Sequence, residues 1–271
     1  MKNKLGISIM TSHKDKCETD EQIRIFSECG FDSFFLSCGV TEDFGKIIGW
    51  SKIAEKNKIQ FEAVHAPTGG VDSVWMGNGE EYIKKIMNIL DICSEARVDK
   101  LVMHAAQNPD IQISDVGREG FRKIENYAKH NGVCICYENA VSVSQLRRLL
   151  ADCDDFHGFC YDTGHHFCYT PQEKIDDLIN KHIKYTHIHD NLGKKSPDEN
   201  RFEDMHLLPY DGLIEWESFY KSIESADYTG TLNLELSCNN KKEYNMISYK
   251  EFVNEAQKRI CMLINNKGRV L

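Results

Sequence analysis

The chain has 271 residues, which suits one large domain or two small ones and is close to the about 250 residues of a typical (β/α)8 barrel. Hydrophobic residues make up 41% and charged residues 28% of the sequence, a balance that excludes a disordered chain and predicts a sizeable core. The net charge of -9 disfavours a nucleic-acid-binding protein, although a local basic groove can coexist with a negative total. No apolar run reaches about 18 residues, so no membrane span is expected.

Eight strand-then-helix units are predicted along the chain, with no residue-level repeat and no low-complexity linker. The strands are expected at 5–10, 31–38, 59–67, 100–106, up to Glu138, up to Asp162, 183–191 and 229–237. The helices are expected at 20–30, 45–57, 80–97, near 115–131, between Glu138 and Asp162, at 171–182 with a proline at its N-terminus, at 216–227 and at 249–264. This order predicts a single α/β domain over residues 1–271, a (β/α)8 TIM barrel.

The last predicted strand shows the parity that a barrel requires. Leu232, Leu234 and Leu236 alternate with two polar residues. The leucines should therefore meet the helices, while Asn233 and Glu235 should face the interior of the barrel.

The cysteines also have a structural interpretation. The sequence contains 11 of them, and no charged start with a following apolar segment precedes the first predicted strand. An odd number without regular spacing predicts reduced thiols in a cytoplasmic protein. Cys134 and Cys136 share strand parity with Glu138, and Cys160 shares it with Asp162. We expect these three cysteines to be small core residues, with a thiolate ligand or nucleophile as the alternative.

Acidic and imidazole side chains stand at or just beyond the carboxyl ends of six predicted strands and in the segment 192–213. They are His65, His104, Glu138, Asp162, His165, His187, Asp204, His206 and Glu235. Each has a simpler explanation on its own; a histidine after a strand is commonly a core or loop residue, and Asp162 could cap the following helix. Together at one barrel mouth they would repel or desolvate one another unless cations held them, so the sequence predicts a site for one to three divalent cations.

The ligand types narrow the choice of metal. Imidazole and carboxylate without a thiolate at a matching position favour zinc, manganese or iron over calcium. Glu138, Asp162, His187 and Glu235 come from four successive strands and are predicted to surround one cation. His189 shares parity with His187 and is the alternative ligand. The other five residues would hold further cations or contact the substrate.

Short motifs around these residues resemble the xylose-isomerase-like TIM-barrel superfamily. The motifs are VHAP (64–67), VMHAA (102–106), YENA (137–140), YDTGHH (161–166), THIHDN (186–191), EDMH (203–206) and LNLELS (232–237). This superfamily includes sugar-phosphate isomerases and epimerases and the endonuclease IV type of apurinic endonuclease. The resemblance implies that Glu138, Asp162, His187 and Glu235 bind the metal of the epimerase branch, with the two glutamates doubling as the acid/base pair. It also implies that all nine residues match the three-metal ligand set of the endonuclease branch.

The segments that would hold a substrate favour the first branch. The segment 38–46 contains Glu42 and Asp43 against one lysine, and 68–79 contains no basic residue. Trp75, in the second of these, could stack on a sugar or pack onto the barrel rim. The segment after the seventh strand contains bases that could bind a phosphate and acids that offset them: Lys194, Lys195, Arg201, Asp198, Glu199, Glu203 and Asp204.

We therefore expect a metal-dependent isomerase or epimerase of a small polyol, sugar or sugar phosphate, in which one glutamate removes a proton and another returns it. The alternative is an endonuclease IV-like phosphodiesterase acting on abasic DNA, which would need basic and aromatic groups to hold the nucleic acid. A metal-binding barrel without catalytic activity is a third interpretation. Nucleic acid is the less favoured partner, and the chain could form a homo-oligomer.

Overall fold

Eight parallel strands form the central sheet of the computed structural model, which describes residues 3–38 and 44–265. The strands are β1 (Leu5–Ser8), β2 (Ser33–Leu36), β3 (Gln60–His65), β4 (Lys100–His104), β5 (Cys134–Glu138), β6 (Gly158–Asp162), β7 (Ile183–His187) and β8 (Leu232–Leu234). They are paired in the order β7-β6-β5-β4-β3-β2-β1-β8. Just beyond β7, the backbone N–H of Ile188 donates to the carbonyl of Asn233 at 2.7 Å, and Glu235 donates back to Ile188 at 3.1 Å. These bonds join the first and last strands of the list, so the predicted (β/α)8 barrel is confirmed.

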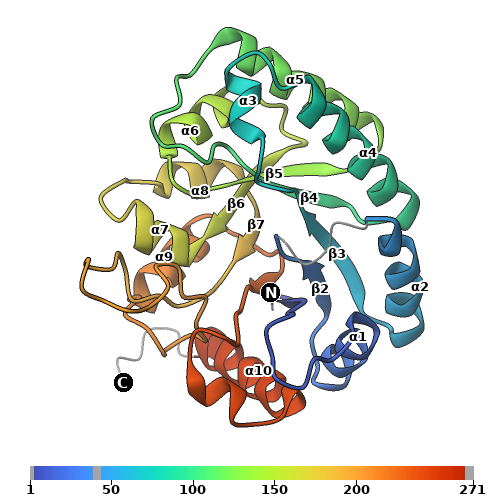
Figure 1. Cartoon of the computed structure of the whole chain (residues 1–271), viewed down its shortest axis with the longest axis vertical. Helices are drawn as coiled ribbons and strands as arrows, with labels where there is room; N and C mark the ends of the chain where they lie inside the picture. The colour runs from blue at the N-terminus through green and yellow to red at the C-terminus, as the bar shows by residue number, and fades with distance from the viewer. Residues whose placement is uncertain (1–2, 39–43, 266–271) are drawn as a thin grey trace.

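A helix follows each strand and packs on the outside of the ring (Figure 1). These helices are α1 (Thr19–Glu28), α2 (Ile47–Asn57), α4 (Glu80–Ala96), α5 (Asp115–His130), α6 (Val143–Asp152), α8 (Asp176–His182), α9 (Trp216–Ser225) and α10 (Tyr249–Asn265). Each buries one apolar face against the sheet; in α4 this face includes Ile86, Ile89 and Leu90. No described helix is long and apolar enough to cross a membrane.

Short helices that the sequence did not predict lie at the carboxyl ends of two strands. They are α3 (Val71–Trp75) after β3 and α7 (Thr163–Tyr169) directly after β6. Helix α7 begins there because the Asp162 carboxylate accepts a hydrogen bond from the His165 backbone N–H at 2.6 Å and so caps the helix. The cap and the metal-ligand interpretation of Asp162 are therefore compatible, since a carboxylate has two oxygens.

The predicted helix at 171–182 is wrong at its start. Pro171 lies in a turn, and α8 begins only at Asp176. Ile175 is buried with a non-helical backbone, and the acidic pair Asp176 and Asp177 follows at the position where the positive end of a helix favours carboxylates. The strands predicted at 183–191 and 229–237 are also too long, because β7 ends at His187 and β8 at Leu234.

The interior of the barrel below the site is filled. A core cluster is formed by Phe35, Ala63, Val102, Cys136, Cys160 and Tyr185, with Cys134 packed against it. The three cysteines are free and lie in the interior, as their strand parity predicted. The side chains of Leu232 and Leu234 belong to the outer core, whereas Asn233 is buried on the other face of β8. Because the lower barrel is packed, a ligand can enter only where the strands end.

Candidate metal centre

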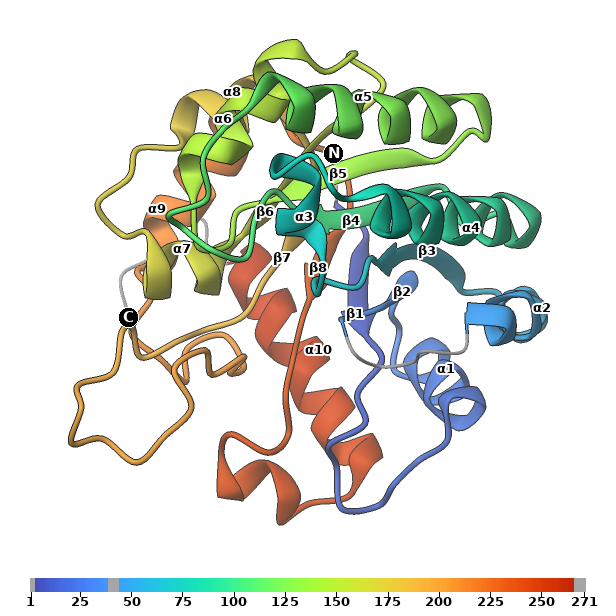
Figure 2. The ribbon, with the colours of Figure 1, turned by 45° about the horizontal axis from the view of Figure 1, so that its top comes forward.

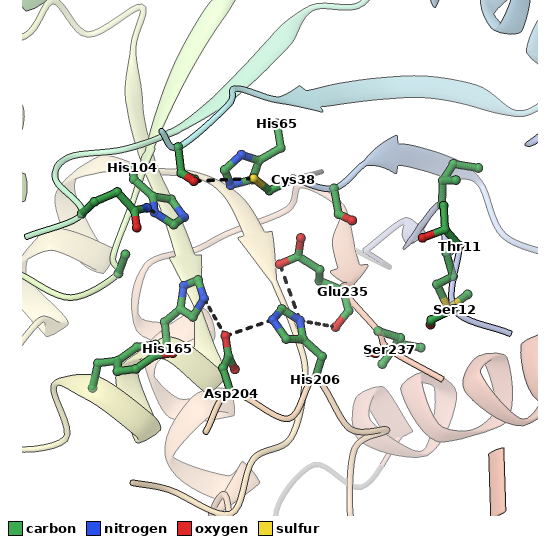
Figure 3. A pocket seen from close by; sticks show the side chains of 18 of the residues that line it. Thr11, Ser12, Cys38, His65, His104, His165, Asp204, His206, Glu235 and Ser237 are labelled. Atoms are coloured by element: carbon green, nitrogen blue, oxygen red, sulfur yellow. Dashed lines mark hydrogen bonds and ion pairs between the residues drawn. The ribbon is translucent and has the colours of Figure 1, made fainter. Parts of the chain in front are cut away.

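All nine predicted side chains lie at the C-terminal ends of the strands, where they face one another. Six of them are labelled in Figure 3: His65 from β3, His104 from β4, His165 from α7, Glu235 from the segment just beyond β8, and Asp204 and His206 from the β7–α9 segment. That segment is the yellow to orange connection that stands out from the barrel in Figure 2. The structure brings the nine together in three groups, which we call the first, middle and third groups.

The first group consists of His65, His104 and Glu138. The Nε2 atoms of His65 and His104 lie 3.0 and 2.9 Å from Oε2 of Glu138. Glu138 is fully buried at the end of β5; His104 approaches it from the neighbouring strand β4, and His65 from β3, one strand further along the sheet. The other oxygen of its carboxylate, Oε1, faces the middle group.

The middle group consists of Glu138, Asp162, His187 and Glu235, whose ligand atoms lie within 4.8 Å of one another. Nδ1 of His187 lies 2.5 Å from Oε1 of Glu138, 3.2 Å from Oε2 of Glu235 and 3.9 Å from Oδ2 of Asp162. The imidazole is held in this direction by stacking on Phe35, with ring centroids 4.7 Å apart. These are the four residues that the sequence grouped around one cation.

The third group consists of His165, Asp204 and His206, together with His189. Nε2 of His165 and Nε2 of His206 each lie 3.0 Å from Oδ2 of Asp204. The two histidines that the sequence offered as alternatives have different neighbours, because His187 belongs to the middle group and His189 to the third. Shared strand parity placed both histidines in the interior, but it did not reveal that they belong to different groups.

The hydrogen bonds of the histidines fit a divalent cation. In three of them Nδ1 faces a backbone carbonyl, to which only an Nδ1–H can donate, so Nε2, which faces a carboxylate, is the nitrogen that would bind a cation once its proton is released. These bonds are His65 to Ala66 (2.7 Å), His165 to Asn139 (3.1 Å) and His206 to Glu235 (3.1 Å). His104 differs: the amide nitrogen Nε2 of Gln107, which the sequence did not single out, lies 2.6 Å from its Nδ1, so Nδ1 of His104 accepts a hydrogen bond instead of donating one. An outer partner on the second nitrogen is the usual arrangement of a metal-binding histidine.

The charges in the cluster depend strongly on one another. Burial acts to lower the pKa of His65, but its contacts with Cys38 and Glu138 outweigh burial and raise that pKa to about 10. Burial acts to raise the pKa of Glu235, but His187 and His206 outweigh it and lower that pKa to about 2. Neighbouring imidazoles likewise hold the pKa values of Glu138 and Asp204 well below the usual range, so these three groups are ionised at neutral pH, and either protons on the imidazoles or bound cations must balance them.

The thiol of Cys160 lies closer to the cluster than the sequence suggested. Sγ of Cys160 lies within 4.8 Å of ligand atoms of Glu138 and His187, because its side chain points into the barrel one layer below Asp162. Burial raises the pKa of Cys160 to about 12, so the protonated thiol is present at neutral pH. Its place in the packed core agrees with the structural interpretation.

A cavity of about 430 Å³ opens above the cluster (Figure 3). Its walls carry hydroxyl, amide, imidazole and carboxylate groups, including Ser12, Thr68, Gln107 and Glu235. Among the described residues that line it, there is no lysine or arginine. An adjoining cavity of about 300 Å³ shares Thr68 with the first and contains Lys85.

Several residues considered for substrate binding lie elsewhere. Trp75 is buried, and its indole N–H donates to the Ala105 carbonyl at 2.8 Å, so this side chain packs onto the barrel rim. Lys195 donates to the carbonyl of Arg201 at 3.1 Å, and Arg201 donates to that of Gly193 at 3.0 Å, so both bases stabilise their own loop. Lys194 does not line the described cavity wall. Glu42 and Asp43 lie outside the described residues.

The fold and the cluster define a (β/α)8 barrel with a histidine–carboxylate centre at the C-terminal ends of its strands. Residues 23–255 match the family described as xylose isomerase-like TIM barrel, and the chain belongs to this family.

Known proteins with this fold include several sugar-processing enzymes. A D-tagatose 3-epimerase-like protein has a TM-score of 0.70 at 20% identity, over 95% of this chain and 99% of that one. The IolI protein, solved with a zinc atom, has a TM-score of 0.74 at 14% identity, over 98% and 100%. In sequence, the protein y4fM of Sinorhizobium fredii (strain NBRC 101917 / NGR234) is 26% identical over 172 residues, which are 56% of this chain. The match spans about half of y4fM, 52% of its length.

Proposed function

We propose that the protein is a divalent-metal-dependent isomerase or epimerase of a sugar, a sugar phosphate or a related polyol. The observation that carries this proposal is the approach of two glutamates to one ligand atom. Glu138 and Glu235 lie 2.5 and 3.2 Å from Nδ1 of His187; Glu235 lines the cavity, and Glu138 is buried behind it. Two carboxylates beside one reacting carbon are what a proton transfer between two faces requires.

The residues of the middle group would hold the cation. When bound, a divalent cation supplies Lewis acidity that makes the C–H next to a carbonyl more acidic. Glu138 and Glu235 are carboxylates at neutral pH, because their pKa values lie below the usual range despite burial, so either can accept this proton. The other glutamate returns a proton to the same carbon or to the neighbouring one, which gives an epimer or an isomer.

The known structures and the cavity support the same class of substrate. D-Psicose 3-epimerase from Clostridium cellulolyticum H10, solved with D-tagatose, has this fold with a TM-score of 0.72 at 14% identity. A cavity of about 430 Å³ suits a small molecule, and its hydroxyl and amide groups suit a polyol. Among the described residues that line the main cavity there is no lysine or arginine that could bind a phosphate, so an uncharged sugar fits this cavity. The phosphate of a sugar phosphate would have to reach Lys85 in the adjoining cavity.

Exchange of a carbon-bound proton with solvent tests the proposal. Purified protein is loaded with Mn²⁺ or Zn²⁺ and incubated in D2O with ketohexoses, ketopentoses, their phosphates and inositol-type keto sugars. We expect deuterium at the carbon next to the carbonyl of at least one substrate by NMR, and no incorporation after chelation. Metal-loaded protein that exchanges none of these compounds would contradict the proposal.

A metal-dependent phosphodiesterase is the second candidate, and one observation favours it. The first and third groups are complete beside the middle group, although a single cation would be enough for an epimerase. Clustered cations can generate a hydroxide and stabilise the leaving oxygen of a phosphodiester. Chelator-sensitive nicking of a duplex with an abasic site would replace the isomerase proposal with this one.

A further inference from the structure

We propose that His189 is a positioning residue that links the middle and third groups, by orienting the Asp162 carboxylate on one side and supporting the His206 ring on the other. This inference rests on the metal centre of the proposed function. His189 is fully buried just beyond the end of β7. It was considered from the sequence only as a substitute for His187.

The contacts of His189 reach both groups. Its Nε2 lies 3.1 Å from Oδ1 and 3.2 Å from Oδ2 of Asp162, a member of the middle group. Its ring stacks on that of His206, a member of the third group, with centroids 3.9 Å apart and an angle of 9° between the planes. Its Nδ1 has no hydrogen-bond partner among the described residues and lies 3.9 Å from Oδ1 of Asp204.

The stacking decides between a ligand and a positioning role. Two imidazoles that bind one tetrahedral cation point at it within their own ring planes, so the rings diverge and their centroids lie about 5 Å apart. The parallel rings of His189 and His206 are closer than this, at 3.9 Å. Both cannot direct their lone pairs to the same cation in this arrangement. Since Nε2 of His206 faces Asp204, His206 is the ligand and His189 supports it from its face.

The start of helix α7 is built around His189. Oγ1 of Thr163 donates to the His189 carbonyl at 2.9 Å and accepts from the His189 N–H at 3.1 Å. Gly164 lies under the ring, where a Cβ atom would be 2.0 Å from Cε1 of His189. Three consecutive residues therefore contact this histidine: Asp162 its ring nitrogen, Thr163 its backbone and Gly164 the face of its ring. These contacts fix the imidazole in one orientation.

The consequence concerns the direction of the Asp162 carboxylate. The His165 N–H holds its Oδ1 at 2.6 Å, and Nε2 of His189 lies within hydrogen-bond distance of both of its oxygens. Together they keep Oδ2 on the side of His187, 3.9 Å from its Nδ1. Loss of an outer partner of a ligand commonly weakens metal binding by about 10- to 100-fold. We expect this loss in the middle group when the His189 donor is removed.

Two variants separate the donor from the ring. His189→Gln keeps an N–H donor near the position of Nε2, and His189→Phe keeps the ring and its volume but has no donor. His166→Phe is the control, because His166 is the neighbour of His165 in α7 and its ring nitrogen faces the carbonyl of Glu173 instead. Mn²⁺ binding is measured by titration calorimetry on metal-free full-length protein, together with thermal unfolding of the same samples.

We expect His189→Phe to weaken the tightest Mn²⁺ binding by about 10- to 100-fold, His189→Gln to restore most of it, and the control to bind like the wild type. Equal binding by His189→Phe and wild type, or equal loss in both His189 variants, would overturn the inference while leaving the metal centre intact. Wild-type protein that binds no Mn²⁺ would overturn the metal centre and this inference with it. If His189→Phe does not fold, His189→Leu, which is smaller and also lacks a donor, is measured in its place with the same expectation.

Discussion

Replacement of Gly164 by alanine places one methyl group against the ring of His189. The added Cβ would lie 2.0 Å from Cε1, 2.3 Å from Nδ1 and 2.6 Å from Nε2 of that ring. Cβ contacts below 3.0 Å are essentially never found, so the nearest ring atom must move by at least 1.0 Å, the difference between these two distances. The ring cannot simply swing away, because Asp162 holds its Nε2 and His206 lies against its face.

Two terms of opposite sign set the magnitude. Overpacking of a buried site costs about 1–3 kcal/mol. Alanine regains about 0.5–1 kcal/mol over glycine within a helix, and Gly164 lies in α7 with no positive φ that would require glycine. The free energy of unfolding of the metal-free protein should therefore fall by about 0–2.5 kcal/mol. The tilt imposed on His189 should weaken Mn²⁺ binding by about tenfold or more, because Asp162 loses its fixed direction.

The assay combines urea unfolding of metal-free protein with calorimetric titration of Mn²⁺. Gly49→Ala is the matched control, since Gly49 lies in helix α2 and its Cβ would meet nothing within 4 Å. This control should gain about 0.5–1 kcal/mol and bind Mn²⁺ unchanged. In a double-mutant cycle, His189→Ala should remove the extra cost of Gly164→Ala, because no ring remains to clash. Gly164→Ala that matches the control in both measurements would refute the reasoning.

Further predictions concern activity, metal and stability. Glu235→Gln should lower turnover by about 10²- to 10⁴-fold and leave the circular dichroism spectrum unchanged. The control Glu251→Gln, at the exposed start of α10, should leave turnover unchanged. Undiminished activity of Glu235→Gln would show that the site is misplaced. Elemental analysis of protein purified without chelator should find at least about one equivalent of zinc, manganese or iron; less would count against the metal centre.

Burial is outweighed by neighbouring groups that raise the pKa values of His65 and His206 to about 10 and about 9, so both imidazoles carry protons at neutral pH without metal. Cation binding should therefore release these protons, and the affinity for the cation should rise by up to about tenfold per released proton for each pH unit between pH 7 and 9. Calorimetry in buffers of different ionisation enthalpy measures the number of protons released. An affinity that does not change with pH would contradict this prediction. Trp75→Ala should lower the free energy of unfolding, measured in urea, by about 3–5 kcal/mol, because the ring is buried. A changed KM with an unchanged free energy of unfolding would indicate that Trp75 stacks on a sugar instead.

Local sequence patterns were enough to predict most of the framework. Apolar runs alternating with amphipathic helices predicted the barrel, and period-2 parity predicted that Asn233 faces the interior while Leu232 and Leu234 meet the helices. Strand ends were predicted less well, because pairing with the neighbouring strand decides where a strand stops. The start of α8 at Asp176 was missed since a proline is compatible with both a turn and a helix start.

For the site, the sequence by itself determined which residue types stand at the strand ends, since strand position and parity follow from the order of the residues. The tertiary structure decided which of them meet. The register of β6 and β7 shifts between Phe159 and Cys160 and pairs Asp162 with His187, so His187 faces the middle group. His189, two residues further on, lies above the start of α7, where Gly164 leaves room for its ring. Parity gives these two histidines the same face, but only the register between strands sets their height in the barrel and hence their partners.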